Sequence, residues 1–433
     1  MNHAERREME SVLQERGMKP SQSDAADLAV VHTCSVTGQA AAKSRNAIRR
    51  ASKTGNTVFV TGCFTGTDPE VAKTLGDHVV TQAGKEPMIN RFADEIDKWL
   101  QTPNSKSKRE FDATSLPITT LPQRQGQHIR AEVRIQDGCD AHCTFCIIPK
   151  IRTTLRSKTI KDVVTEVEKL VNIGHQEIVF TGIFIGAYGH RTALRRKQEN
   201  PEREYLADLI DAVAQVDGLK RLRISSMEPG DVTPVLIDAI VANQPIVAPH
   251  LHLPLQSGSE DVLRKMNRQY SINAYQEMIE LINAQLTIND IPPAITTDII
   301  CGFPTETDSD FEHTIAIAKA VKYLHIHVFP YSVRSGTAAA RWGQLQPEII
   351  KERVQQLIAV DRELSIEYRK NLIGKTVNVL LEQEAENGMK KGRCGHYAEI
   401  SLKTKRSIGE IIPAKVTQVQ SEQTIAGEGF QII

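Results

Sequence analysis

The chain has 433 residues, enough for two to four domains with hydrophobic cores. Its 53 lysines and arginines balance its 53 aspartates and glutamates, which excludes attraction of nucleic acid by a large overall positive charge, so any nucleic-acid site must be a local basic patch. The polar N-terminal residues and the absence of an apolar run of about 18 residues predict neither a signal peptide nor a membrane span.

Residues 1–102 alternate helices and strands. Strands are predicted at residues 27–34, 57–63 and 78–81, and helices at residues 5–16, 37–53, from 68 onward and 86–100. This alternation predicts a parallel, doubly wound sheet, whose ligands lie beyond the carboxyl ends of its strands. Cys34 and Cys63 both fall at that edge. One cysteine in such a place is usually a packing residue, but two at equivalent strand ends favour a pair of ligands.

Residues 103–128 are rich in Pro, Ser, Thr, Lys and Gln and are predicted to be a linker. Six strand-then-helix units follow within residues 129–373, and they predict a partial (β/α)6 barrel with its chemistry on the loops after the strands. The strands are expected at residues 132–136, 177–181, 219–225, 250–255, 295–300 and 323–329, and the helices at residues 160–173, 205–216, 233–242, 270–284, 308–321 and 347–372. Short strands at residues 376–382, 397–402, 410–419 and 423–428 predict a small β-barrel within residues 374–433.

Three of the seven cysteines lie within eight residues, at Cys139, Cys143 and Cys146, in the loop after the first barrel strand. Thiolates at this spacing converge on one inorganic centre, either zinc or an iron–sulfur cluster. A structural zinc site needs four ligands, but no second Cys-x-x-Cys or His pair follows at a suitable distance, and His142 lies inside the loop. Three thiolates therefore favour a four-iron cluster with one iron open to another ligand, with zinc and simple burial as the alternatives. Metal-binding cysteines also predict a reducing, cytoplasmic location.

The pattern Cys-x-x-x-Cys-x-Phe-Cys, with Phe145 in the aromatic position, resembles the signature of the radical S-adenosylmethionine (SAM) enzymes. The resemblance implies that Cys139, Cys143 and Cys146 hold a 4Fe-4S cluster whose open iron binds the amino and carboxylate groups of SAM. It also implies that an electron from this cluster cleaves SAM to a 5′-deoxyadenosyl radical.

Segments after the later strands extend the resemblance to the methylthiotransferases, in matching order and spacing. They occupy residues 181–189, 225–229, 250–259, 297–307 and 327–337. The resemblance then covers nearly the whole chain, as an N-terminal methylthiotransferase domain, a radical SAM barrel and a C-terminal domain of the RNA-contacting TRAM type. His-Val-Phe-Pro-Tyr-Ser at residues 327–332 and Thr-Gly-Ile-Phe-Ile-Gly-Ala-Tyr-Gly at residues 181–189 are most similar to the bacterial enzymes that act on N6-threonylcarbamoyladenosine in tRNA.

The resemblance implies roles for particular residues. Contacts with SAM are expected from Phe145, Thr181, Gly182, Glu228, Gln256 and Asp298. An auxiliary 4Fe-4S cluster that delivers sulfur is expected to take two of its three ligands from Cys34 and Cys63, and two SAM molecules would be used to insert one methylthio group. Glu228 and Asp298 are equally consistent with tying loops together. Cys301 is expected in the core and Cys394 in a turn.

The third auxiliary ligand of the family belongs to a Gly-Cys-x-x-Asn motif that precedes the opening helix. This sequence begins at Met1-Asn2, directly before the predicted helix at residues 5–16. A doubly wound unit begins with a strand on which the helix packs. We therefore expect that strand, and the third cysteine, to be missing from this chain.

The family also implies partners. Basic clusters at residues 43–53, 191–197 and 390–393 are candidates to bind the phosphates of a tRNA anticodon stem-loop. An electron donor such as flavodoxin or ferredoxin is expected, and no membrane. Three alternatives stay open: a methylthiotransferase acting on isopentenyladenosine, a radical SAM enzyme of another reaction type that needs one cluster, and a non-catalytic iron–sulfur protein that binds RNA.

Overall fold

The computed structural model describes residues 2–21, 26–35, 37–82, 89–101, 129–190, 192, 205–420 and 423–428. These residues form two compact units. Residues up to 101 form the first unit together with residues 137–155 and 332–340, and residues 129–136, 156–331 and those from 341 onward form the second. The predicted linker at residues 103–128 lies outside the described residues. Within the described ranges, no helix combines the length and the apolar character that crossing a membrane requires.

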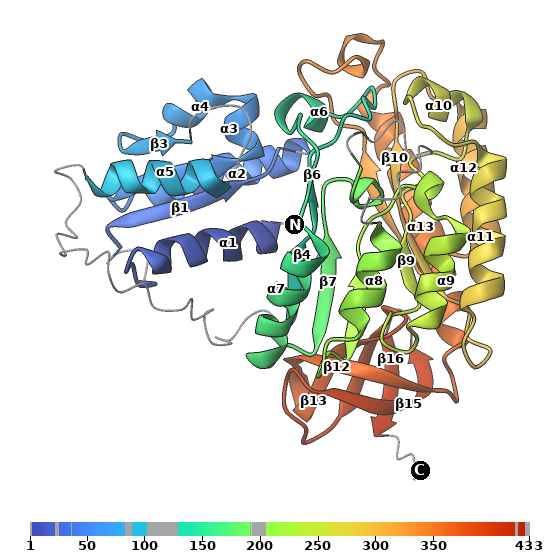
Figure 1. Ribbon diagram of the computed structural model, residues 1–433. Helices are drawn as coiled ribbons and strands as arrows, with labels where there is room; N and C mark the ends of the chain where they lie inside the picture. The colour runs from blue at the N-terminus through green and yellow to red at the C-terminus, as the bar shows by residue number, and fades with distance from the viewer. Residues whose placement is uncertain are drawn as a thin grey trace. The chain divides into compact units, whose positions relative to one another are not determined.

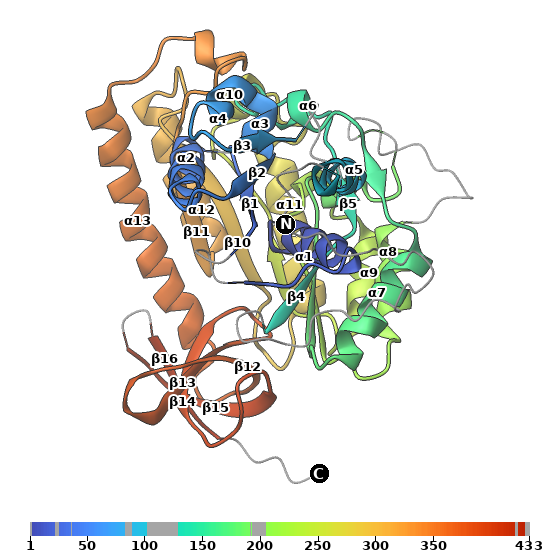
Figure 2. The same ribbon diagram turned by 90° about the vertical axis from the view of Figure 1, so that its left-hand side faces the viewer.

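The first unit is built on a parallel sheet with helices on both faces. The sheet has the order β1-β2-β3, from β1 (Leu28–Thr33), β2 (Thr57–Gly62) and β3 (Val79–Thr81). Helices α1 (Asn2–Glu15) and α5 (Ile89–Leu100) pack around Phe59 on one face, whereas α2 (Gly38–Ser52), α3 (Cys63–Thr67) and α4 (Pro69–Lys73) contribute to the core on the other face (Figure 2). The predicted alternation is confirmed. The three described strands run in sequential order, so the reversal that defines a doubly wound sheet is not among them.

The second unit contains two three-stranded parallel sheets, which continue one another in chain order. Their orders are β4-β7-β8 and β9-β10-β11, and they meet through bridges between Leu222 and Val247 and between Ser226 and His252. The strands are β4 (Arg130–Arg134), β7 (Glu177–Thr181), β8 (Arg221–Ile224), β9 (His250–His252), β10 (Ala294–Cys301) and β11 (His325–Pro330). All six predicted strands are therefore present. Strand β9 is shorter than expected, because Pro254 lacks a backbone donor and Gln256 takes a positive φ of 65°.

Helices of the second unit follow the strands as predicted (Figure 1). They are α7 (Ile160–Asn172), α8 (Leu206–Ala214), α9 (Pro234–Ala242), α11 (Ile272–Leu286), α12 (Asp308–Val321) and α13 (Pro347–Lys370). The sequence did not indicate the short helix α10 (Glu260–Lys265), which Ser259 caps. Short elements complete the description: α6 (Ile148–Ile151), β5 (Gln136–Asp137), β6 (Arg156–Ser157), η1 (Ile185–Ala187), η2 (Pro229–Asp231), η3 (Ala339–Arg341) and η4 (Glu386–Gly388).

The C-terminal strands close into a small barrel of order β12-β13-β14-β16-β15. They are β12 (Thr376–Glu384), β13 (Met389–Cys394), β14 (Glu399–Lys403), β15 (Ile411–Gln420) and β16 (Gln423–Glu428), paired antiparallel except for the parallel pair β14 and β16. The prediction missed β13, because its Lys-Lys-Gly-Arg run lacks apolar alternation. The expectation that Cys394 is a turn residue is wrong: it ends β13, and its side chain is fully buried in the barrel core.

A buried network of charges ties the small barrel to the sheet of β4, β7 and β8. Glu177 pairs with Arg221 and Arg223 at 2.8 Å each. The two guanidiniums also donate to backbone carbonyls of the small barrel: Arg221 to Asn378 at 2.6 Å, and Arg223 to Gly395 at 2.9 Å. Both arginines and Glu177 are buried, so each charge is satisfied away from water.

Candidate metal centres

The loop that carries three cysteines is shaped by its backbone. Gly138 has a φ of +83°, and a Cβ at this position would lie 2.1 Å from the carbonyl oxygen of Thr154, so only glycine fits. The N–H of Cys139 donates to the carbonyl of Arg152 at 3.0 Å, and that of Cys146 donates to the carbonyl of Cys143 at 3.0 Å. The loop therefore folds back on itself, with all three thiols in one short segment.

This donor set fits an iron–sulfur cluster. None of the seven cysteines, all of which lie within the described residues, is in a disulfide. Cys139 is buried, whereas Cys143 and Cys146 are half-buried. The N–H of Ala141 lies 3.4 Å from the Cys139 sulfur, and hydrogen bonds of this kind stabilise ligand sulfurs in iron–sulfur sites. Cys139, Cys143 and Cys146 are thus the residues that would hold such a cluster.

Cys34 and Cys63 lie side by side, as their predicted strand ends imply. Strands β1 and β2 are parallel, and their register places Thr33 opposite Gly62, one residue before each cysteine. Gly62 has a φ of +99°, and a Cβ there would lie 2.3 Å from the carbonyl oxygen of Thr33. Because only glycine tolerates this approach, the chain can turn directly from β2 into α3, which Cys63 begins.

Arg152 joins this pair of cysteines to the loop with three cysteines, within the first unit. One of its terminal nitrogens, Nη1, lies 2.7 Å from the carboxylate of Glu5 and 2.7 Å from that of Asp137. Burial raises the pKa of the Cys63 thiol, and the charge of Arg152 and its hydrogen bond oppose that rise. Arg152 therefore favours the thiolate form, which is the form that binds metals.

Glu5 completes this network from helix α1. Its carboxylate also lies 2.9 Å from the Nε2 atom of His32. Burial alone would raise the pKa of Glu5, but the hydrogen bond from His32 and the charge of Arg152 lower it to about 2. No local sequence pattern marks Arg152, Glu5 or His32, so the sequence alone did not predict their roles.

The residues expected to contact SAM in the second unit lie at or after strand ends. Thr181 ends β7 and is buried, and Gly182 follows it. A Cβ on Gly182 would lie 3.0 Å from the carbonyl oxygen of Gln136, so a larger residue would crowd this turn. Glu228 lies directly before η2, and its carboxylate pairs with Arg268 at 3.4 Å. This ion pair ties two loops together, which is the structural alternative considered for Glu228.

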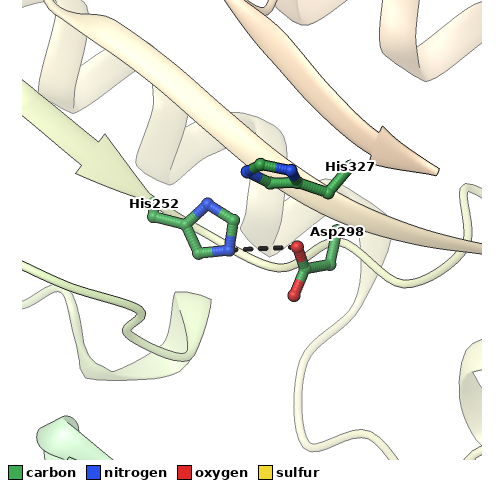
Figure 3. Close-up of side chains that lie close together, drawn as sticks. All are labelled: His252, Asp298 and His327. Carbon is green, nitrogen blue, oxygen red and sulfur yellow. Dashed lines mark ion pairs between the residues drawn. The ribbon is translucent and has the colours of Figure 1, made fainter. Parts of the chain in front are cut away.

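Gln256 and Asp298 are neighbours in the second unit. The N–H of Gln256 donates to the carbonyl of Asp298 at 2.8 Å. The side chain of Asp298 points instead toward two histidines, His252 on β9 and His327 on β11 (Figure 3). The Nε2 atom of His252 lies 3.2 Å from a carboxylate oxygen of Asp298. The sequence did not predict this group, although His252 and His327 occur within the segments at residues 250–259 and 327–337 that resemble the methylthiotransferases.

The two remaining cysteines are core residues. Cys301 ends β10 with no exposed side-chain area, as predicted, and burial raises the pKa of its thiol to about 12. Burial likewise raises the pKa of Cys394, which lies inside the small barrel.

Comparisons with known proteins agree with this arrangement. Residues 133–318 match the model of the radical SAM superfamily, and residues 1–84 match a family described as uncharacterized protein family UPF0004. The chain is 33% identical to the threonylcarbamoyladenosine tRNA methylthiotransferase MtaB of Bacillus subtilis, over 96% of this chain and 91% of that protein. It is 34% identical to the tRNA-2-methylthio-N(6)-dimethylallyladenosine synthase of Streptomyces viridosporus, over 84% of this chain and 70% of that protein.

A solved structure shares the fold at low sequence identity. It is the radical S-adenosylmethionine methyltransferase TsrM of Kitasatospora setae, with a TM-score of 0.50 and 14% identity, and the match covers 77% of this chain and 66% of that one. The sequence relatives, by contrast, share a third of their residues with this chain over most of its length. The chain belongs to the radical SAM tRNA methylthiotransferases, a family with iron–sulfur clusters.

Proposed function

We propose that this chain inserts a methylthio group at C2 of N6-threonylcarbamoyladenosine next to the anticodon of tRNA. The observation that carries the proposal is the occurrence of two cysteine groups in one unit, Cys139, Cys143 and Cys146 on one loop and Cys34 with Cys63 at neighbouring strand ends. One group serves radical generation and the other serves sulfur delivery. A radical enzyme of another reaction type needs only the first group.

The first group would hold a 4Fe-4S cluster with one open iron. When bound, this cluster supplies the electron that cleaves SAM and so makes a radical able to abstract hydrogen from the unactivated C2–H bond of adenine. The role of the chain's own residues is to hold the cluster and SAM and to orient them. Thr181, Gly182, Glu228, Gln256 and Asp298, with Phe145 from the cysteine loop, are our candidates for SAM contacts.

The second group would hold the auxiliary cluster. Cys34 and Cys63 are its two thiol ligands in this sequence, and Arg152 beside Cys63 stabilises negative charge on that sulfur. The relatives named above differ in substrate: MtaB acts on threonylcarbamoyladenosine, and the synthase of Streptomyces viridosporus acts on dimethylallyladenosine. The segments at residues 181–189 and 327–332 support the first substrate.

The small C-terminal barrel is our candidate for the TRAM-type domain that contacts tRNA. Its exposed Lys403 and Lys405 lie beside the turn after β14 and can approach phosphates. A tRNA substrate and reduced thiols are both consistent with a cytoplasmic location. An external donor such as flavodoxin or ferredoxin would supply the electron.

Nucleoside analysis of tRNA tests the substrate. A strain that lacks this gene should lose 2-methylthio-N6-threonylcarbamoyladenosine and accumulate the unthiolated nucleoside, and the wild-type gene should restore it. Loss of the methylthio-isopentenyl nucleoside instead would assign the chain to the other substrate. If the purified, reconstituted protein forms no 5′-deoxyadenosine from SAM under reducing conditions, it is a non-catalytic iron–sulfur protein.

A further inference from the structure

Three adjacent strands of the second unit bring two histidines and one aspartate to the same face. The parallel register places Thr296 opposite His252 and Asp298 opposite His327. Leu251, Ile299 and Ile326 alternate with these residues along the strands and are almost fully buried. Since side chains alternate between the faces of a sheet, the polar group lies on the face opposite those apolar residues. Figure 3 shows the three side chains pointing toward one another.

The positions of the donor atoms suit a metal ion. One ligand atom from each of His252, Asp298 and His327 can be chosen so that all three lie within 4.8 Å of one another. Bonds of about 2.0–2.2 Å to a tetrahedral zinc ion place its ligands roughly 3.4 Å apart, so side chains would rotate to bring these atoms closer when the ion binds. Two imidazole nitrogens and one carboxylate oxygen are a donor set typical of zinc and of iron(II).

The surrounding hydrogen bonds orient the first histidine as a ligand. The Nδ1 atom of His252 lies 2.9 Å from the hydroxyl oxygen of Thr296, and the same oxygen lies 3.0 Å from the Nε2 atom of His250. The hydroxyl of Thr296 is therefore hydrogen-bonded to one ring nitrogen of His252, and the other ring nitrogen faces Asp298. Histidines that bind metals usually have the second ring nitrogen hydrogen-bonded in this way, which fixes the tautomer and the ring orientation.

The second histidine is packed against a neighbouring histidine that is itself held in place. The ring of His325 packs edge to face against His327, with centroids 4.5 Å apart, and a carboxylate oxygen of Asp361 holds the Nδ1 atom of His325 at 3.0 Å. The packing of His325 therefore restricts the orientation of the His327 ring.

We propose that His252, Asp298 and His327 bind one divalent transition-metal ion, for which Zn²⁺ is a suitable probe. The site has no cysteine ligand and is additional to the iron–sulfur sites. Three protein ligands leave a fourth position open to water or to an oxygen donor of a bound molecule, as in catalytic rather than structural zinc sites. The competing explanation is a plain ion pair between His252 and Asp298, in which His327 has no part.

Zinc binding by the full-length protein tests the proposal. The protein is first loaded anaerobically with iron and sulfide, so that the cysteines are occupied, and is then titrated with Zn²⁺ by calorimetry. We expect one additional Zn²⁺ per chain, with an X-ray absorption spectrum that shows only nitrogen and oxygen neighbours at about 2.0–2.1 Å. Sulfur neighbours at about 2.3 Å would place the ion on cysteines and would overturn the proposal.

Variants assign the ligands. His252→Ala, His327→Ala and Asp298→Asn should each weaken Zn²⁺ binding by more than tenfold, and Thr296→Val should weaken it about tenfold through the orientation of His252. His313→Ala removes an exposed histidine elsewhere in the same unit and should leave binding unchanged. Equal iron content and far-UV circular dichroism would show that each variant folds. Unchanged Zn²⁺ affinity in a folded His252→Ala/His327→Ala double variant, or no additional Zn²⁺ on the wild type, contradicts the proposal.

Discussion

The guanidinium of Arg152 lies 2.7 Å from the carboxylate of Glu5, and this buried ion pair joins helix α1 to the loop that carries Cys139, Cys143 and Cys146. The backbone of Arg152 takes part as well, because its carbonyl accepts the hydrogen bond from the N–H of Cys139. One residue thus contacts the first cysteine of the loop through its backbone and Cys63 through its side chain.

Arg152→Gln should destabilise the first unit by about 3–5 kcal/mol, because it leaves the buried carboxylate of Glu5 without its cation. Trp99 in α5 reports on this unit when Trp342 is replaced by Phe, so urea unfolding followed by fluorescence measures the loss. Arg6→Gln is the matched control, since Arg6 pairs with Glu10 in an exposed contact worth less than about 1 kcal/mol. Adding Glu5→Gln to Arg152→Gln should recover part of the stability. Equal urea midpoints for the two arginine variants would show that the buried pair does not stabilise the unit.

Replacing any one of Cys139, Cys143 or Cys146 by Ala should abolish the formation of 5′-deoxyadenosine from SAM, because a cluster with an open iron cannot lose a ligand. Cys301→Ala is the control: its buried, protonated thiol lies in the core, so SAM cleavage should persist. The reaction is followed by chromatography of the nucleoside products. Cleavage by the triple cysteine variant would disprove the assignment.

Replacing Cys34 and Cys63 should separate the cleavage of SAM from the transfer of the methylthio group. Cys34→Ala/Cys63→Ala should lower the iron content and stop methylthio transfer to tRNA, but it should still form 5′-deoxyadenosine. The physical reason is that these thiols belong to neighbouring strand ends and not to the loop that would bind SAM. Full thiolation of tRNA by this variant would mean that the sulfur is delivered from elsewhere.

The second unit should lose stability as the pH falls from about 6.5 to about 4. Burial, together with Arg223 and Arg221, lowers the pKa of His396 to about 4. Between pH 6.5 and about 4, His396 binds a proton in the unfolded chain but not in the folded chain. The free energy of unfolding therefore decreases as the pH falls, by on the order of 3 kcal/mol for this one group. His396→Gln should flatten this dependence in urea unfolding followed by Trp342 in a Trp99→Phe background, whereas His313→Gln should not. An unchanged slope in His396→Gln would show that His396 is not the group responsible.

Binding of tRNA should weaken with salt, and the lysines should contribute unequally. Lys390 and Lys391 lie 3.0 Å and 3.6 Å from the carboxylates of Glu384 and Glu399, and Arg393 lies 3.7 Å from that of Glu382. The carboxylates partly neutralise these three charges. Replacing one of them should therefore reduce the salt dependence of binding less than replacing Lys403 or Lys405. Each lost phosphate contact should reduce the slope by about one, measured by filter binding across salt concentrations. A larger reduction in slope on replacing Lys390, Lys391 and Arg393 would place the RNA on β13.

Local patterns were sufficient for much of the fold and for the positions of the two cysteine groups. The strands at residues 177–181 and 423–428 and the helix at residues 308–321 were predicted at their observed bounds, because apolar periodicity and Thr307 as a capping residue are encoded within a few positions. The loop with three thiols is defined by spacing alone. The adjacency of Cys34 and Cys63 followed from a general rule, since carboxyl ends of parallel strands meet at one edge.

The contacts of Arg152 with Glu5, and the meeting of His252, Asp298 and His327, needed the tertiary structure. The local sequence around each of these residues would form the same local structure with a neutral residue in its place. The same holds for Cys394, whose Gly-Arg-Cys-Gly surroundings resemble a turn but whose strand closes a barrel. Periodicity decides which face of a strand is buried, but the register between distant strands decides which side chains meet, and that register is selected by the packing of the whole unit.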